Sequence, residues 1–196
     1  MDVFRVLLFI LLSISLIKYT HYTSDNMAQT ISEDISIFSW NVRSNFNISK
    51  PYLELHASVC DLICISDHGL YECELHKLDN ILDQYTGMGK SSKHLSNMNL
   101  GKKRGFGGCA ILWKKVISNR VRPLPELGTD RICVVQINID GHNYYVISVY
   151  LPHQTCKIDY FKDELNKLIQ VCNECNANGT VIVLGDTNCH RGQNYP

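Results

Sequence analysis

Short runs of apolar and β-branched residues recur along the chain and predict the strands of a layered fold. Each run is four to eight residues long and is bounded by polar or turn-forming residues, as is typical of strands buried in a sheet. The predicted strands cover residues 35–42, 62–66, 110–113, 132–139, 144–151 and 181–184. Asp140-Gly141 joins two of these runs and is a strong signal for a tight hairpin.

Apolar residues at helical spacing lie between several of these runs. The segment after Pro51 is interpreted as a helix, and a second helix is expected over residues 74–84, ended by the glycines at positions 87 and 89. A longer amphipathic helix is expected from about Asp159 to near Gly179. Strands that alternate with helices, together with one hairpin, predict an α/β or α+β layered fold.

The first 30 residues do not follow this pattern. Residues 6–17 form an apolar run that is short for a membrane span, and Met27 offers a second start site. We therefore treat residues 1–30 as a hydrophobic leader outside the fold and expect the folded domain to cover residues 34–196. Use of the leader would make the chain secretory or membrane-anchored, and a start at Met27 would make it nuclear or cytoplasmic without membrane contact.

The composition is that of one globular domain. The chain has 196 residues, of which 45% are hydrophobic, and its 19 basic residues balance 19 acidic ones. Nine cysteines are an odd number and lie mostly in apolar runs, which favours buried free thiols and an intracellular protein. Cys172 and Cys175 have CxxC spacing, but no second pair follows at zinc-finger distance, so structural zinc is not expected.

The zero net charge is a cancellation between two segments. Residues 86–122 contain nine Lys or Arg and no acidic residue, whereas residues 52–83 contain seven acidic residues and one lysine. The basic segment would suit a polyanion such as nucleic acid, and the acidic segment would suit a divalent cation. Two solvated surface faces would explain the same counts.

Polar residues follow four of the predicted strands where each apolar run ends. Taken alone, each has an ordinary explanation as a turn residue, a helix cap or an interfacial aromatic. Taken together, they offer carboxylate and amide oxygens, which hard divalent cations prefer, and Asn and Tyr donors, which suit a phosphoryl oxygen. The candidate catalytic residues are Asn41, Asp67, Tyr150, Asp186 and Asn188.

The segments around these residues carry a family resemblance. SIFSWNV at 36–42, CDLICISDH at 60–68, VISVYLP at 146–152 and VIVLGDTN at 181–188 resemble, in order, the motifs of the endonuclease/exonuclease/phosphatase superfamily. Asp-His-Gly-Leu after the second strand and Asp130-Arg131-Ile132 resemble in particular the endonuclease domain of non-LTR retrotransposons. The resemblance covers residues 34–196 and implies a DNase I-like fold, a four-layer α/β/β/α sandwich of two mixed β-sheets, incomplete at the C-terminus.

The resemblance also implies a role for each candidate residue. Asn41 would orient the phosphate or support the metal, and Asp67 would occupy the place of the metal-binding carboxylate. Tyr150 would contact the scissile phosphate, and Asp186 with Asn188 would orient the attacking water. The implied cofactor is Mg²⁺, or Mn²⁺ in its place, with no organic cofactor.

The implied partner is DNA, bound by a monomer. Between the site-bearing segments lies a basic loop, from Lys90 to Arg104, that could run along a DNA backbone, and Arg131 would add a second contact. The candidate DNA-binding residues are Lys102, Lys103, Arg104 and Arg131.

Two features depart from the family pattern. The family usually has Glu where this chain has Asp67, which is one methylene shorter, so metal affinity is in question. The family also ends in a Ser-Asp-His motif that supplies the general base, and this sequence stops at Pro196, shortly after its Gly-Asp-Thr-Asn motif. His68, His153 and His190 lie near candidate positions, but a histidine beside a motif is more often incidental.

Three functions follow from these features. The first is a metal-dependent phosphodiesterase that nicks DNA, of retrotransposon origin and inactive if the terminal motif is missing. The second is a secreted or membrane-tethered phosphodiesterase of the same fold, which requires use of the leader. The third is a catalytically dead relic that binds nucleic acid through its basic loop.

Overall fold

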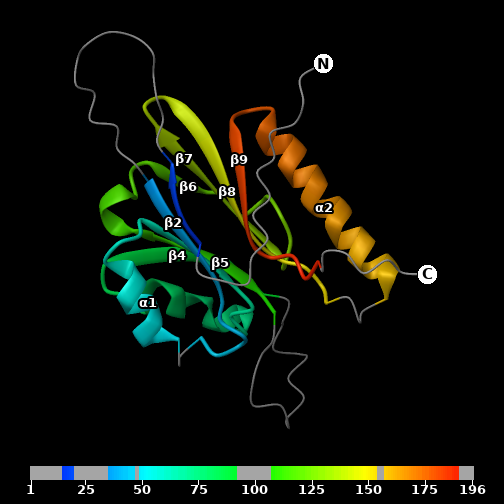
Figure 1. Cartoon of the computed structure of the whole chain (residues 1–196), viewed down its shortest axis with the longest axis horizontal. Coiled ribbons are helices and arrows are strands. Elements are labelled where there is room, and N and C mark those ends of the chain that lie inside the picture. The colour runs from blue at the N-terminus through cyan, green and yellow to red at the C-terminus, as the bar shows by residue number, and fades with distance from the viewer. Residues whose placement is uncertain (1–14, 20–34, 47–48, 92–106, 154–156, 190–196) are drawn as a thin grey trace.

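Two β-sheets pack face to face and helices cover their outer faces (Figure 1). The computed structural model describes residues 15–19, 35–46, 49–91, 107–153 and 157–189. Both sheets are mixed, and the helices lie on opposite sides of the pair. This arrangement confirms the expected four-layer α/β/β/α sandwich.

The first sheet has the strand order β1-β2-β3-β5-β4. Neighbouring strands β2 and β3 are parallel, and the other neighbours are antiparallel. The bounds are Ser15–Tyr19 for β1, Ile35–Asn41 for β2, Leu62–Ser66 for β3, Tyr85–Lys90 for β4 and Cys109–Lys114 for β5.

The second sheet has the order β6-β7-β8-β9, with β8 and β9 parallel. The predicted hairpin is confirmed, because Asp140 and Gly141 both have positive φ and connect antiparallel β7 and β8. The bounds are Val121–Pro123 for β6, Ile132–Ile139 for β7, His142–Tyr150 for β8 and Thr180–Asp186 for β9.

Three apolar layers hold the sandwich together. One lies between the first sheet and α1 (Lys50–Ala57) with the 3-10 helix η1 (Glu72–Asn80), and includes Phe38, Leu53, Ile65 and Leu78. A second lies between the two sheets and includes Ile37, Cys64, Val135 and Val146. The third lies between the second sheet and α2 (Ile158–Asn176), and includes Val134, Ile147, Leu168 and Val171.

The helix expected over residues 74–84 is instead the 3-10 helix η1, followed by strand β4. Leu75, Leu78 and Ile81 are spaced by three residues, so a helix with three residues per turn also places them on one face. The two glycines expected to end that helix lie inside β4, where neighbouring side chains approach closely. A β-carbon on Gly89 would lie 2.5 Å from Leu78 Cδ1.

Part of the expected leader joins the first sheet. Residues 15–19 form β1, which pairs antiparallel with β2 along its whole length. The backbone of this apolar segment therefore supplies the edge strand next to β2. None of the helices in the described ranges is long and apolar enough to cross a membrane.

The cysteines of the described ranges are free thiols, and most of them are buried as expected. Those with buried side chains are Cys60, Cys64, Cys109, Cys133 and Cys175. They fill space within the apolar layers, in the manner of small hydrophobic residues.

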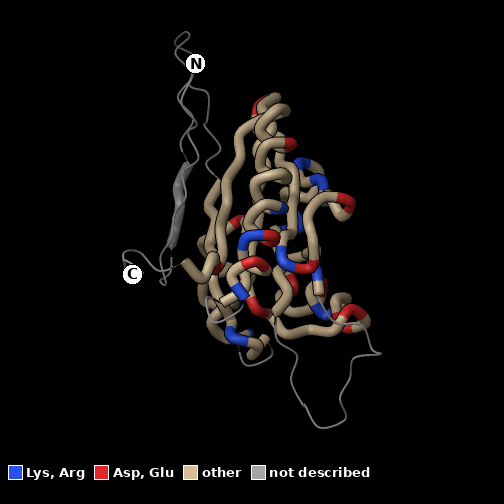
Figure 2. The backbone as a smooth tube through the Cα atoms, turned by 90° about the vertical axis from the view of Figure 1, so that its right-hand side faces the viewer, with Lys and Arg blue, Asp and Glu red and all other residues tan. Residues whose placement is uncertain are grey.

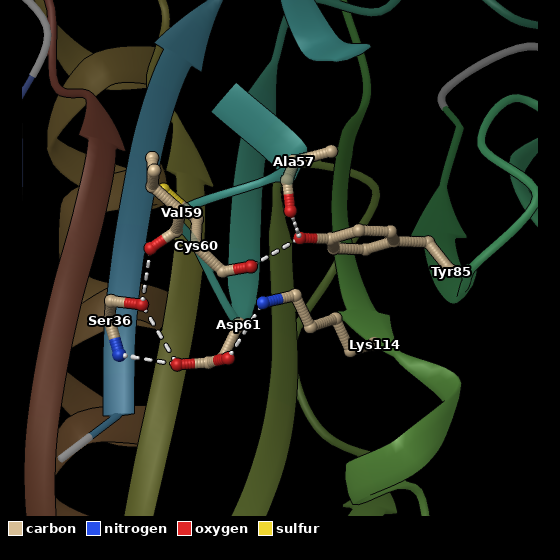
Figure 3. A network of polar contacts seen from close by, with 7 residues as sticks. All are labelled: Ser36, Ala57, Val59, Cys60, Asp61, Tyr85 and Lys114. Atoms are coloured by element: carbon tan, nitrogen blue, oxygen red, sulfur yellow. Dashed lines mark hydrogen bonds and ion pairs between the residues drawn. The ribbon is translucent and has the colours of Figure 1, made fainter. Parts of the chain in front are cut away.

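A polar network fastens the strands at the end of the first sheet where β2 and β3 begin (Figure 3). Asp61 Oδ2 accepts hydrogen bonds from the backbone N–H of Ser36 at 2.9 Å and from Ser36 Oγ at 2.8 Å, and Asp61 Oδ1 pairs with Lys114 Nζ at 3.1 Å. Tyr85 Oη lies 3.0 Å from the carbonyl oxygen of Ala57 and also within hydrogen-bond distance of that of Cys60, so its single proton serves these two acceptors. Burial would raise the pKa of Asp61, but the bonds from Ser36 and Lys114 outweigh it and hold the pKa below its ordinary value.

Replacement of Asp61 tests this network through the pH dependence of stability. Because the folded-state pKa is lowered, the stabilisation is present above about pH 4 and is lost as pH falls through the folded pKa. Asp61→Asn should lower the free energy of unfolding by about 1–2 kcal/mol at pH 7 and by less near pH 2, as measured by urea unfolding across a pH series. The exposed helix variant Asp163→Asn should change it by less than about 0.5 kcal/mol. A constant Asp61→Asn deficit from pH 7 to 2 would contradict this reading.

Candidate functional site

The two sheets are joined at one rim by a direct hydrogen bond between candidate residues. Asn41 is the last residue of β2 and Asp186 is the last residue of β9. Asn41 Nδ2 donates to Asp186 Oδ2 at 2.6 Å, across 145 positions of sequence and from one sheet to the other. Asn41 Oδ1 accepts the backbone N–H of Arg43 at 2.8 Å, which holds the amide group in this orientation.

Strand registers bring two further candidates to the same rim. In the parallel pair β2 and β3, Asn41 lies opposite Ser66, so Asp67 follows directly beside it. In the parallel pair β8 and β9, Tyr150 lies opposite Asp186. Parallel neighbours end at the same edge of a sheet, which is why the polar residues after separate apolar runs collect here.

Asp67 is held by the loops on both sides of it. Its Oδ1 accepts hydrogen bonds from Ser44 Oγ at 2.9 Å and from the backbone N–H of Gly107 at 2.6 Å. Its own backbone N–H donates to the carbonyl of Gly108 at 2.8 Å. Asp67 has a φ of 54°, and Ser44 has a φ of 56°, so the chain turns sharply at both points. The bonds described for this carboxylate involve Oδ1, which leaves Oδ2 as the oxygen that a cation could use.

Asp186 and Asn188 form a short turn that also fixes the end of β8. Asp186 Oδ1 accepts the backbone N–H of Asn188 at 2.9 Å, and Asn188 Nδ2 donates to the carbonyl of Leu151 at 2.7 Å. The backbone N–H of Leu151 donates to the carbonyl of Asp186 at 2.9 Å. Both carboxylate oxygens of Asp186 therefore accept a hydrogen bond, one from Asn41 and one from Asn188.

Gly185 allows Asp186 to occupy this position. Its φ is 126°, and a β-carbon at this residue would lie 2.1 Å from the carbonyl oxygen of Val149 on the neighbouring strand. A side chain here would force β9 away from β8.

Arg131 lies against the site rather than at its outer surface. Its Nη1 donates to the carbonyl of Tyr150 at 3.1 Å and its Nε donates to Tyr160 Oη at 3.1 Å. Burial would lower the pKa of Arg131, but the bond to Tyr160 and the nearby carboxylates of Asp130 and Glu164 hold it above its ordinary value. The guanidinium is therefore a permanent cation beside the candidate tyrosine.

The other candidate DNA-binding residues, Lys102, Lys103 and Arg104, lie outside the described residues. Lys90 lies at the start of the predicted basic loop, and its ammonium group donates a hydrogen bond to the carbonyl of Pro125. In Figure 2, basic and acidic positions are interspersed along the described backbone of the face that is shown.

His68, the candidate histidine next to Asp67, is buried and serves the structure. Its Nδ1 accepts the backbone N–H of Leu70 at 2.9 Å, so its Nε2 carries the proton that is donated to the carbonyl of Lys90 at 3.0 Å. Burial lowers the pKa of His68 to about 4. Both ring nitrogens are engaged, so this ring is not placed to accept a proton from water. His153 is exposed, and His190 lies outside the described residues.

The candidate side chains at the rim carry oxygen atoms, which are the donors that hard divalent cations prefer. Within the ranges that the structure describes, no three His, Cys, Asp or Glu side chains gather into a metal cluster. Mg²⁺ needs fewer protein ligands, because it usually keeps several waters and binds through one or two carboxylates. Asp67 offers a carboxylate oxygen, Oδ2, of this kind, and Asn41 lies at the end of the neighbouring strand with its Oδ1 accepting the backbone N–H of Arg43.

Three contributors to the site were missed in the sequence. Ser44 and Gly107 hold Asp67, and Tyr160 holds Arg131. The Gly107-Gly108 pair signals an unusual backbone, and both residues have positive φ. The role of Tyr160 could not be predicted from the sequence, because its contact with Arg131 depends on how α2 packs.

No protein-family model matches the chain, and no curated protein matches it. Solved structures do match. The chain resembles the endonuclease domain of TRAS1, a telomere-specific non-LTR retrotransposon, at 14% identity and a TM-score of 0.54 over 79% of this chain. It resembles D. rerio TDP2 complexed with a single-stranded DNA product at 21% identity, a TM-score of 0.54 and 80% coverage.

A third similar structure is the 3′ phosphatase NExo from Neisseria bound to a product DNA hairpin, at 19% identity and a TM-score of 0.54 over 80% of this chain. The chain spans 59% of the TRAS1 domain, 61% of TDP2 and 59% of NExo. The chain therefore shares the fold of these structures, which confirms the expected DNase I-like fold. It is a fold of nucleases and phosphoesterases.

The buried state of His68 predicts a second pH dependence of stability. The unfolded chain takes up a proton at the ordinary histidine pKa, and the folded chain does so only near pH 4, so stability falls as pH drops from about 6.5 to 4. The contribution is roughly 3 kcal/mol at most. His68→Gln should lose this slope in urea unfolding, whereas the exposed control His76→Gln should keep it. If the free energy of unfolding depended on pH equally in wild type and His68→Gln, the buried, neutral state of the His68 ring would be refuted.

Proposed function

We propose that the chain is a metal-dependent phosphodiesterase of retrotransposon origin that nicks DNA at the rim described above. The observation that carries the proposal is the hydrogen bond between Asn41 and Asp186. This bond links a candidate residue of one sheet to a candidate residue of the other, which supports a single site such as an in-line attack on a phosphodiester requires.

The metal would be held by Asp67, with support from Asn41. When bound, Mg²⁺ or Mn²⁺ would neutralise charge on the phosphate and stabilise the leaving oxygen. Asp67 Oδ1 is fixed by Ser44 and Gly107, so the carboxylate is preorganised with its second oxygen left for the ion.

Asp186 and Asn188 would orient the attacking water. Asp186 already accepts one hydrogen bond at each carboxylate oxygen, and each oxygen can accept a further bond from water. Asn188 Nδ2 is committed to the carbonyl of Leu151, which leaves its Oδ1 as the atom that would accept a hydrogen bond from the water. Tyr150, opposite Asp186 in the register, would donate its hydroxyl to the scissile phosphate.

DNA as the partner is supported by two similar structures that contain DNA, TDP2 with a single-stranded product and NExo with a product hairpin. The resemblance to the TRAS1 domain supports the retrotransposon origin. Lys102, Lys103 and Arg104 would supply backbone contacts that weaken as salt is added. The protein would act as a monomer and would need no organic cofactor.

Nicking of supercoiled plasmid tests the proposal directly. We expect relaxed circles to accumulate with the full chain in the presence of Mg²⁺ and not in the presence of a chelator. Asp186→Ala should lower the rate by about 100-fold or more, because it removes the water-orienting carboxylate and the partner of Asn41. Asp163→Asn on the exposed face of α2 should match wild type. Equal nicking by Asp186→Ala and wild type would remove the assigned role.

Replacement of Asp67 tests the metal site without relying on turnover. Asp67→Asn can keep the bonds from Ser44 and Gly107 to its amide oxygen, but it places an NH₂ group where Oδ2 lies. Mn²⁺ binding, followed by electron paramagnetic resonance, should weaken by about 10-fold or more relative to wild type. Unchanged Mn²⁺ affinity would show that the ion binds elsewhere.

A nucleic-acid-binding protein without turnover is the second candidate, and it is favoured by His68, the histidine next to Asp67, because both of its ring nitrogens are engaged and it is not placed to act as a general base. In that case wild type would bind DNA in a salt-sensitive manner and would not nick plasmid at any concentration of Mg²⁺ or Mn²⁺.

A further inference from the structure

A tyrosine–arginine–tyrosine stack joins helix α2 to the candidate site. The guanidinium carbon of Arg131 lies 5.6 Å from the ring centroid of Tyr150 and 5.7 Å from that of Tyr160. Tyr150 ends β8, Tyr160 lies in the first turn of α2, and Arg131 directly precedes β7. The stack therefore connects three elements that are separate in the sequence.

Arg131 contacts Tyr150 in three ways. The backbone N–H of Tyr150 donates to the carbonyl of Arg131 at 2.9 Å, and Arg131 Nη1 donates back to the carbonyl of Tyr150 at 3.1 Å. The guanidinium also lies within cation–π distance of the phenol ring. The next carbonyl, that of Leu151, is bound by Asn188, so two consecutive carbonyls at the end of β8 are fixed from different elements.

Arg131 is itself oriented by α2. Its Nε donates to Tyr160 Oη at 3.1 Å, and Glu164, one turn further along the helix, contributes a buried negative charge that favours the arginine cation. Glu164 is 3% exposed and its Oε1 pairs with Lys167 at 2.7 Å. The contacts of Arg131 therefore depend on the planar arrangement of its N–H donors as well as on its positive charge.

We propose that Arg131 is a positioning residue that orients the Tyr150 ring toward the scissile phosphate, with Tyr160 as its support, and not primarily a DNA contact. This inference rests on the function proposed above for Tyr150. It differs from the expectation that Arg131 binds the DNA backbone, because Nε and Nη1 each donate a hydrogen bond within the protein and the guanidinium lies within cation–π distance of both tyrosine rings.

Arg131→Lys separates the two roles. Lysine keeps the positive charge, which is sufficient for a phosphate contact, but it lacks the planar fork that binds Tyr150 and Tyr160 together. In the full chain with ¹³C-labelled tyrosine, the order parameter of the Tyr150 ring measured by NMR should fall in Arg131→Lys and Arg131→Ala alike. Tyr160→Phe, which removes only the hydroxyl acceptor, should give a smaller fall. Arg122→Ala, on the exposed edge strand β6, should leave Tyr150 unchanged.

Cleavage and DNA binding supply the second readout. The single-turnover rate of nicking should fall by about 10- to 100-fold in Arg131→Lys, while the Kd for a DNA duplex measured without metal should change by less than about 2-fold. A Tyr150 ring that remains ordered in Arg131→Lys would overturn the proposal. So would a nicking rate restored by lysine but lost with alanine, which would indicate a phosphate contact. Absence of nicking in wild type would instead reject the proposed function, and the ring measurement would still decide whether Arg131 orients Tyr150.

Discussion

The hydrogen bond between Asn41 and Asp186 is the constraint on which the geometry of the rim depends. The layer between the two sheets is apolar, and apolar packing is not directional, so it favours contact without specifying how the strand ends align. A 2.6 Å bond between an amide and a carboxylate is directional and charge-assisted. Tyr150 and Asn188 are both bonded to β9 or to the turn after it, and Asp67 follows the strand next to Asn41, so this contact links the candidate residues of one sheet to those of the other.

The opposite end of the first sheet supports the same alignment from a distance. Asp61 binds Ser36 at the start of β2 and Lys114 at the end of β5, on either side of β3. A slip of one residue between β2 and β3 would break these bonds and would also move Asn41 away from Ser66. The strands are therefore held by polar groups at both ends and by apolar packing between them, so the network around Asp61 supports the register of the rim from the opposite end of the sheet.

The sequence was informative where an apolar run ends in a polar residue. The strands that carry Asn41, Tyr150 and Asp186 follow from short runs of apolar and β-branched residues, which depend on local residue type. The 3-10 helix η1 and the strand position of Gly89 could not be predicted in this way, because spacing by three residues fits two kinds of helix and a glycine in close packing looks like a helix stop. The partners of Arg131 depend on the packing of α2 against β7 and β8, which no local pattern encodes.

The conformation of Asp67 gives a physical reason for an aspartate at this position. A residue with φ near 54° is strained for most side chains, but Asp and Asn tolerate this region because their short polar groups bond to nearby backbone and side-chain groups. Here the carboxylate receives Ser44 Oγ and the backbone N–H of Gly107, and the turn carries the residue off the strand path after Ser66. The reach of the carboxylate toward the rim is therefore set by the backbone turn as well as by side-chain length. A longer glutamate at residue 67 would gain one methylene of reach, but it would lose the geometry by which Oδ1 is held.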